Sequence, residues 1–335
     1  MDIVYSARYH IDIGLHVFPT LKYRLVYEAI ERSGLSPVRF VEPEAATWEE
    51  LALVHTPEYL AKMRDGTMSV EDVAQLELPW SPEMVDGFRL MVGGTIDAAC
   101  LACAVERHGR TPSRDGHVAR HGVATPRLRV ACHIGGGPHH AFPNHGEGFC
   151  PFNDVAVAVR VLQARGIERI AIVDLDVHHG NGTAFIFNPS GAGTPHADSH
   201  VFTFSMHEQH NYPMWKPRGS LDIGLADGAH DATFLRELER ALPEVIASNP
   251  QCVFYLAGAD PYEDDQLGGL RLTKDGLRRR DRMVMDAIRG EGCPLVVTLA
   301  GGYARKVEDT VAIHAATIQE ARDATTKTRG REEED

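Results

Sequence analysis

Three side chains of types that bind metals follow one apolar run of the chain at alternate positions. The run is Ile170 to Val173, and Asp174, Asp176 and His178 come after it. Residues two apart on an extended chain point to the same side, so these three side chains are expected to converge where the strand ends. The pattern therefore indicates a candidate metal centre.

Polar clusters also follow three other runs that resemble strands. These clusters are Pro138-His139-His140, Gly258-Ala259-Asp260-Pro261 and Ala300-Gly301-Gly302-Tyr303. In an open α/β sheet, ligands bind at the carboxyl ends of the strands. Four strand ends that carry reactive side chains favour an enzyme.

An Asp-x-His pair together with a distant aspartate supplies two carboxylate oxygens and one imidazole nitrogen. Such a set leaves positions for water and substrate, which is typical of a catalytic metal site. Zn²⁺ suits these ligands best, and Fe²⁺ or Mn²⁺ would also accept them. The alternative is that Asp176 and His178 only cap neighbouring helices.

His139 and His140 need another role, because adjacent side chains are expected to diverge too far to share one metal. A histidine with a pKa near neutral can move protons during hydrolysis. The hydroxyl of Tyr303 could donate to an oxyanion. The alternatives are core histidines bonded to the backbone and an ordinary buried tyrosine.

The order of the expected elements indicates the fold. Strands are expected at residues 2–5, 38–41, 129–133, 169–173, 201–205, 252–256 and 295–299, and helices at 23–32, 57–63, 82–106, 154–165, 232–248 and 274–291. Alternating strands and helices with nearly continuous apolar strands predict a mostly parallel sheet covered on both faces. We expect a single-domain, three-layer α/β/α fold.

We expect this domain to span residues 1–321. Residues 107–128, rich in His, Gly, Arg and Pro, are predicted to be a flexible insertion, and residues 322–335 a disordered tail.

Composition narrows the class of protein. Hydrophobic residues at 43% and charged residues at 24% are ordinary for a globular protein. The net charge of −13 disfavours direct binding to nucleic acid and mildly favours cationic molecules or lysine-bearing peptides. The six cysteines lack metal-ligand spacing, and Cys100 and Cys103 are interpreted as core residues. With no signal peptide and no long apolar stretch, we expect a cytoplasmic protein without membrane contact.

Several longer motifs resemble one known family. They are His16-Val17-Phe18-Pro19-Thr20-Leu21-Lys22-Tyr23, Leu78-Pro79-Trp80-Ser81-Pro82, Asn144-His145-Gly146-Glu147-Gly148-Phe149-Cys150 and Leu267-Gly268-Gly269-Leu270. From about His10 to Ile318 the chain resembles the histone deacetylases, zinc-dependent amidohydrolases of the arginase-like fold. The motifs look most like class IV members and their bacterial relatives.

The resemblance implies roles for individual residues. The implied zinc ligands are Asp176, His178 and Asp260, the general base is His140, the second histidine is His139, and the carbonyl-polarising residue is Tyr303. Asp174 would orient His139, and Asn181 would orient His140. Many family members place aspartate at the position of Asn181, and a neutral partner raises imidazole basicity less than a carboxylate does.

Two further sites follow from the resemblance. A structural potassium ion would be bound by Asp174, the backbone carbonyls of Asp176 and His178, and Ser205 with Met206. A narrow substrate tunnel would be lined by Phe149, Tyr212 and Leu267.

The expected activity is zinc-dependent removal of a short acyl group from lysine side chains of a peptide or protein. One alternative is a deacetylase of acylpolyamines or other small amides, for which Glu263, Asp264 and Asp265 could hold a second ammonium; rim contacts or solvated loop charges are the favoured roles for these acids. A second alternative is a catalytically inactive module that binds acyl-lysine. A dinuclear ureohydrolase would need more bridging carboxylates. Glycines 135 to 137 could open a cavity for longer acyl chains.

Overall fold

A single sheet of eight parallel strands forms the centre of the molecule. The computed structural model describes residues 1–108, 128–187 and 198–326. The strands are β1 (Asp2–Val4), β2 (Arg39–Val41), β3 (Val130–His133), β4 (Ile170–Asp174), β5 (Val201–Glu208), β6 (Leu221–Leu225), β7 (Cys252–Leu256) and β8 (Leu295–Thr298). Their order across the sheet is β2-β1-β3-β8-β7-β4-β5-β6, and every pairing is parallel.

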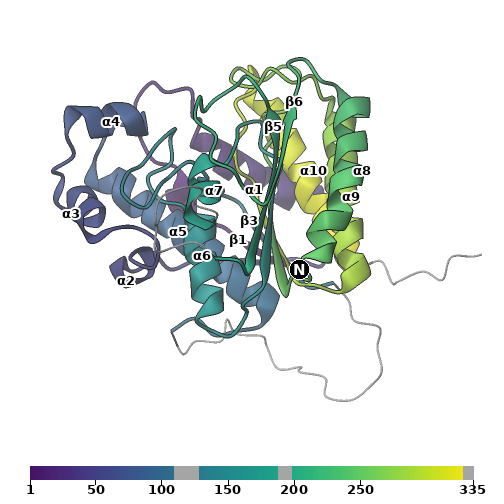
Figure 1. Ribbon diagram of the computed structural model, residues 1–335, viewed down its shortest axis with the longest axis horizontal. Helices are drawn as coiled ribbons and strands as arrows, with labels where there is room; N and C mark the ends of the chain where they lie inside the picture. The colour runs from purple at the N-terminus through teal and green to yellow at the C-terminus, as the bar shows by residue number, and fades with distance from the viewer. Residues whose placement is uncertain (109–127, 188–197, 327–335) are drawn as a thin grey trace, which may run out of the picture.

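Helices cover both faces of this sheet (Figure 1). One layer contains α1 (Leu21–Ser33), α8 (Asp231–Ala247), α9 (Lys274–Glu291) and α10 (Val307–Thr326), and the other contains α5 (Pro82–Cys103), α6 (Asp154–Gln163) and α7 (Asn181–Phe187). Three short helices, α2 (Trp48–Leu51), α3 (Pro57–Asp65) and α4 (Val70–Leu76), extend the second layer, and a 3₁₀ turn, η1, spans Ala7–Tyr9. The predicted three-layer α/β/α fold is confirmed.

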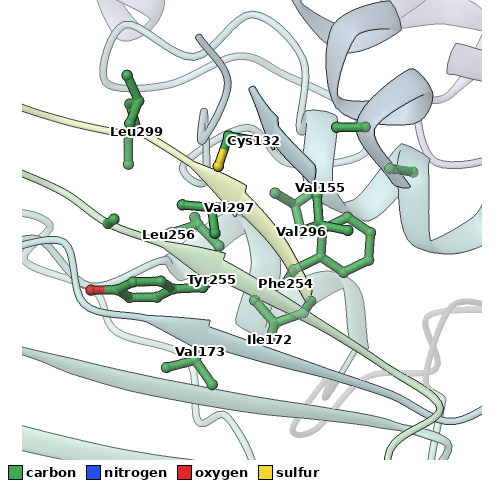
Figure 2. Packing of buried hydrophobic residues seen from close by; sticks show 14 of the residues in the cluster. Cys132, Val155, Ile172, Val173, Phe254, Tyr255, Leu256, Val296, Val297 and Leu299 are labelled. Carbon is green, nitrogen blue, oxygen red and sulfur yellow. The ribbon is translucent and has the colours of Figure 1, made fainter. Parts of the chain in front are cut away.

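Apolar side chains on both faces of the central strands explain why the sheet is sandwiched. Every residue of β3, β4, β7 and β8 is buried. Figure 2 shows Ile172, Phe254 and Val296 from three neighbouring strands packed close together in this core. Full burial of one such side chain contributes about 1.5–3 kcal/mol, so the two helical layers are needed to remove both faces from water.

The four strands whose ends carry the polar clusters are neighbours in the sheet. Their order is β3-β8-β7-β4, and all four run in the same direction. The loops that follow them therefore emerge at one edge, which brings together side chains more than 160 positions apart in the chain.

Helix termini follow recognisable local signals. Asn153 caps α6 by accepting a hydrogen bond from the Ala156 amide, at 3.0 Å, and Thr273 caps α9 in the same way. The helix expected to reach residue 106 ends at Cys103, because Ala104 adopts a left-handed conformation with φ of 56°.

Some elements differ from the prediction. The edge strand β6 and the helices α2, α4, α7 and α10 were not predicted, and α10 continues to Thr326, beyond the expected end of the domain at residue 321. The edge strand alternates between partly buried and exposed residues and contains a glycine, so its five residues carry a weak strand signal. The rest of the predicted tail, residues 327–335, lies outside the described residues.

Arg107, the first residue of the predicted insertion, belongs to the packed domain. Its side chain is 4% exposed and pairs with Glu50 at 2.7 Å and with Asp97 at 3.1 Å. Burial alone would raise the pKa of Glu50, but the guanidinium outweighs burial and keeps this pKa below its usual range. His108 and Leu128 of the predicted insertion are also described. Its remaining residues, 109–127, lie outside the described residues.

Arg107→Met is expected to lower the free energy of unfolding by about 3–5 kcal/mol, because Glu50 and Asp97 would remain buried without their cation. Urea denaturation measures the change. Arg64→Met is the matched control, since Arg64 pairs with Asp65 on the surface and such pairs contribute about 0–1 kcal/mol. Equal losses in the two variants would contradict the anchoring role of Arg107.

Among the described residues, we find no helix that combines the length and the apolar character needed to span a bilayer.

Candidate metal centre and catalytic groups

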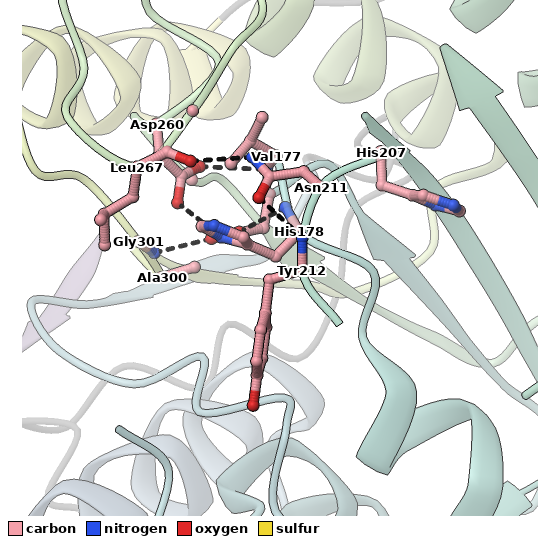
Figure 3. A network of polar contacts seen from close by, with 12 residues as sticks. Val177, His178, His207, Asn211, Tyr212, Asp260, Leu267, Ala300 and Gly301 are labelled. Carbon is pink, nitrogen blue, oxygen red and sulfur yellow. Dashed lines mark hydrogen bonds and ion pairs between the residues drawn. The ribbon is translucent and has the colours of Figure 1, made fainter. Parts of the chain in front are cut away.

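Asp176, His178 and Asp260 form a buried group at the carboxyl edge of the sheet. One ligand atom from each lies within 4.8 Å of the others. His178 Nδ1 is 3.0 Å from Asp176 Oδ1 and 3.4 Å from Asp260 Oδ2. Figure 3 shows His178 and Asp260 turned toward one another from the loops after β4 and β7. Asp174, the first residue of the predicted converging set, is not a member of this group.

Backbone amides hold the two carboxylates in place. The Val177 amide donates to Asp260 Oδ1 at 3.0 Å, and the Gly301 amide donates to Asp176 Oδ2 at 2.9 Å. A Cβ atom at residue 301 would overlap both carboxylates. The loop after β8 can approach the group this closely because residue 301 is glycine.

The donor set fits a divalent cation. Asp260 Oδ2 is fully buried and has no hydrogen-bond partner among the described residues, although buried polar atoms are normally paired. Burial and the neighbouring charge of Asp176 raise the pKa of Asp260 to about 7. Two carboxylates and one imidazole share a buried position, and one of the carboxylate oxygens accepts no hydrogen bond there, as expected of ligands to a divalent metal.

His139 and His140 converge, contrary to the prediction that adjacent side chains diverge. Their Nε2 atoms are 3.1 Å apart, and their ring centroids are separated by 4.1 Å. The two residues occupy a turn after β3 instead of an extended segment, so the alternation expected for a strand does not apply. Both rings are therefore available at the same point in the site.

Asp174 and Asn181 give the two histidines different environments. His139 Nδ1 is 2.7 Å from Asp174 Oδ2, whereas His140 Nδ1 is 2.7 Å from Asn181 Oδ1. Burial alone would lower the pKa of His139, but the charges of Asp174 and Asp176 raise it to about 9. Burial and the adjacent His139 and His178 lower the pKa of His140 well below its usual value. One histidine thus holds a proton while the other can accept one.

Tyr303 lies beside these groups with its hydroxyl protonated. Burial, followed by the charges of Asp176 and Asp260, raises the pKa of Tyr303 well above its usual value. The buried Lys22 donates from Nζ to the carbonyl oxygens of Ala300 and Gly302, at 3.1 and 3.4 Å. Because these carbonyls belong to the loop that carries Tyr303, Lys22 helps to position the tyrosine.

A cavity of about 150 Å³ leads to this group, and all three residues predicted to form a tunnel line it. Tyr212 packs edge-on against His140, with centroids 5.0 Å apart, and Phe149 packs edge-on against Tyr303 at 6.1 Å. Glu77 and Asn211 also line the cavity. The walls are thus mainly aromatic and apolar, with one carboxylate.

The acids expected near a second ammonium do not line this cavity. Asp265 is buried and accepts hydrogen bonds from the amides of Tyr303 at 2.7 Å and Leu267 at 2.9 Å. Asp264 pairs with Arg305. Glu263 is exposed, and the carboxylate that does line the cavity belongs to Glu77.

Two of the residues implied for potassium, Asp174 and Ser205, are neighbours in the sheet. Ser205 is the register partner of Asp174 in the pairing of β4 with β5, and its hydroxyl is 3.0 Å from His207 Nδ1. Met206 is fully buried. Potassium binding stays a prediction.

Three residues at this site had no predicted role. They are Lys22, Glu77 and Glu147, whose carboxylate accepts a hydrogen bond from Asn181 Nδ2 at 2.7 Å. Lys22 and Glu147 lie within motifs that the resemblance singled out. A lysine between apolar residues at the start of a helix was the available signal for Lys22. Glu77 carried no such signal, because its place in the cavity depends on where the end of α4 packs.

An all-parallel sheet whose polar side chains gather after four adjacent strands defines the arginase-like α/β class. The histone deacetylase domain matches residues 16–318 of the chain. A histone deacetylase 2 from Arabidopsis thaliana is 30% identical over 332 residues, covering 93% of this chain and 78% of that protein. The chain belongs to the histone deacetylase family.

Two further similarities agree with this assignment. An uncharacterized protein of Picosynechococcus is 39% identical over 311 residues, covering 92% of this chain and 93% of that protein. The crystal structure of the HDA15 HD domain superposes with a TM-score of 0.69 at 23% identity, covering 96% of this chain and 90% of that chain. The latter supports the fold alone, while family membership supports a deacetylase among the hydrolases.

Proposed function

We propose that this protein is a zinc-dependent deacylase that hydrolyses the amide between a short acyl group and a lysine side chain. One observation carries the proposal: a buried Asp-His-Asp group and two converging histidines lie at the inner end of an aromatic cavity. The cavity suits a linear methylene stem, since aromatic walls pack against methylenes and exclude water.

The residues of the site divide the work of amide hydrolysis. His140, neutral because of burial, would take a proton from the attacking water. The Tyr303 hydroxyl would donate to the developing oxyanion. His139, whose pKa lies near 9, holds a proton that can pass to the departing amine.

Zinc would be held by Asp176, His178 and Asp260, and when bound it would supply a Lewis acid that polarises the amide carbonyl and makes water more acidic.

A small inner cavity supports a short acyl group. It is lined by Gly136, Gly137 and Pro138 together with Phe18 and Phe88, and its volume is about 40 Å³. This space could hold only a few water-sized groups, because one water needs about 10–15 Å³. The small volume beside Gly136 and Gly137 therefore supports a short acyl group over a long one.

Glu77 favours a second candidate, an acylpolyamine deacetylase. Its carboxylate lines the outer cavity, where a second ammonium of a polyamine would lie. A peptide substrate can also use this carboxylate, as a hydrogen-bond acceptor for its backbone, so lysine stays the first candidate.

Comparison of kcat/KM for acetyl-lysine peptide, myristoyl-lysine peptide and acetylputrescine tests the proposal. We expect the order acetyl-lysine, then acetylputrescine, with myristoyl-lysine slowest because it exceeds the inner cavity. Glu77→Gln should weaken acetylputrescine turnover more than peptide turnover, since only the diamine carries a second charge. A clear lead for acetylputrescine would replace the lysine assignment with the second candidate.

A further inference from the structure

The amide of Asn181 is engaged at both ends. Its Oδ1 lies 2.7 Å from His140 Nδ1, and its Nδ2 donates to Glu147 Oε1 at 2.7 Å. Asn181 is 1% exposed, so water cannot readily replace either partner. A chain of two short contacts thus joins His140 to a carboxylate.

Glu147 is held as an anion by several donors. Its Oε2 lies 3.2 Å from Gln75 Nε2 and 3.4 Å from His145 Nε2, and the Tyr212 hydroxyl also donates to it. Burial alone would raise the pKa of Glu147, but the hydrogen bonds from His145 and Asn181 keep it below its usual range. An ionised carboxylate can accept hydrogen bonds but cannot donate them.

This anion determines which way the Asn181 amide points. Only the amide nitrogen can donate to a carboxylate, so Nδ2 must face Glu147 and Oδ1 must face His140. An amide oxygen only accepts, so His140 Nδ1 must carry the hydrogen. The lone pair of the neutral ring is then on Nε2, the nitrogen that faces His139 and the site.

We propose that Glu147 is a positioning residue that acts through Asn181 to keep His140 in the tautomer whose Nε2 is free to accept a proton. The inference rests on the proposed function, in which His140 is the base. In this arrangement the carboxylate that orients His140 does not bond the imidazole directly, as an aspartate partner would. It acts through one intervening residue, Asn181.

Without the anion, the Asn181 amide could turn by half a rotation. Its nitrogen would then donate to His140 Nδ1, the proton would move to Nε2, and His140 could no longer take a proton from water. Glu147→Gln keeps the size of the side chain and presents both a donor and an acceptor to Asn181, so both orientations become satisfied.

Glu147→Gln in the full chain is expected to lower kcat by about 10–100-fold, the usual cost of losing a partner that orients a ligand or base through another group. The change should fall on kcat more than on KM. Tyr212→Phe is the matched comparison, because it removes the tunnel contact to Glu147 and leaves Asn181 bonded. Its effect is expected on KM.

A second substitution distinguishes positioning from packing. Asn181→Asp in the Glu147→Gln background puts a carboxylate directly on His140 Nδ1, and the side-chain amide introduced by Glu147→Gln can donate to it. This double variant should recover most of the lost kcat. Asn181→Asp alone places two carboxylates in direct contact, so the kcat of this single variant should stay low. Failure of the double variant to exceed Glu147→Gln would overturn the proposal.

The tautomer can be read without any turnover. In a long-range ¹H–¹⁵N spectrum, assigned by the signals that His140→Gln removes, wild-type Nδ1 should be the protonated nitrogen and Nε2 the bare one. Glu147→Gln should show the opposite form or a mixture. An unchanged tautomer in Glu147→Gln would overturn the inference. Absence of wild-type activity on every acyl amine would instead defeat the proposed function, and the spectrum would still test the role of Glu147.

Discussion

His178→Ala is expected to yield a folded protein that contains no zinc and has no measurable deacylase activity. The two aspartates that remain cannot replace the imidazole, which supplies the nitrogen ligand of a set whose atoms lie within 4.8 Å of one another. Elemental analysis of the purified variant measures the metal, and hydrolysis of an acetyl-lysine peptide measures activity.

The neighbouring histidine offers a matched control. His179 lies 3.4 Å from Asp222 and packs against His207, away from the ligand group. His179→Gln should therefore retain zinc. Circular dichroism must show that His178→Ala is folded, because metal binding can contribute to folding. Full zinc occupancy in a folded His178→Ala protein would disprove the ligand assignment.

Tyr303→Phe is expected to retain zinc and fold while turnover falls by about 10²–10³, equivalent to about 2.7–4 kcal/mol, as for loss of one oxyanion donor. The hydroxyl is the only group removed, and the ring contacts with Phe149 and Phe18 persist. Steady-state kinetics on acetyl-lysine peptide give the loss in kcat. His140→Ala should be at least as severe.

Turnover of Tyr303→Phe at the wild-type rate would make the tyrosine a packing residue. Thermal denaturation supplies the control, since a large drop in stability would point to altered packing of the loop that Lys22 holds.

The sheet and the location of the site were predictable because both depend on local patterns. Apolar runs such as Ile170 to Val173 mark buried parallel strands, and polar residues directly after them mark the carboxyl edge. The sequence does not give the order of strands, yet the four marked strands proved adjacent. Their adjacency is what converts four separate motifs into one site.

Geometry within the loops was less predictable. The convergence of His139 and His140 depends on a turn that follows β3, and the alternation rule for strands gave the wrong expectation there. Likewise, Asp265 was expected at the rim, but its carboxylate accepts bonds from loop amides. Such contacts arise from loop conformation, for which residue type alone is a weak guide.

Long-range partners were missed for the same reason. Glu147 and Asn181 are 34 positions apart, and their contact depends on how the loop before α6 meets the start of α7. Arg107 was assigned to an insertion from local composition, although Glu50 and Asp97 hold it inside the domain.

Hydrolysis of an acetyl-lysine peptide by the same protein sample before chelation, after chelation and after addition of one equivalent of Zn²⁺ tests the central claim most directly. The account predicts release of acetate, its loss with the metal, and its recovery with zinc, while the fold persists throughout. Undiminished hydrolysis by protein shown to be free of metal would contradict zinc dependence. Binding of the peptide without hydrolysis by fully loaded protein would show an inactive acyl-lysine-binding module instead of an enzyme.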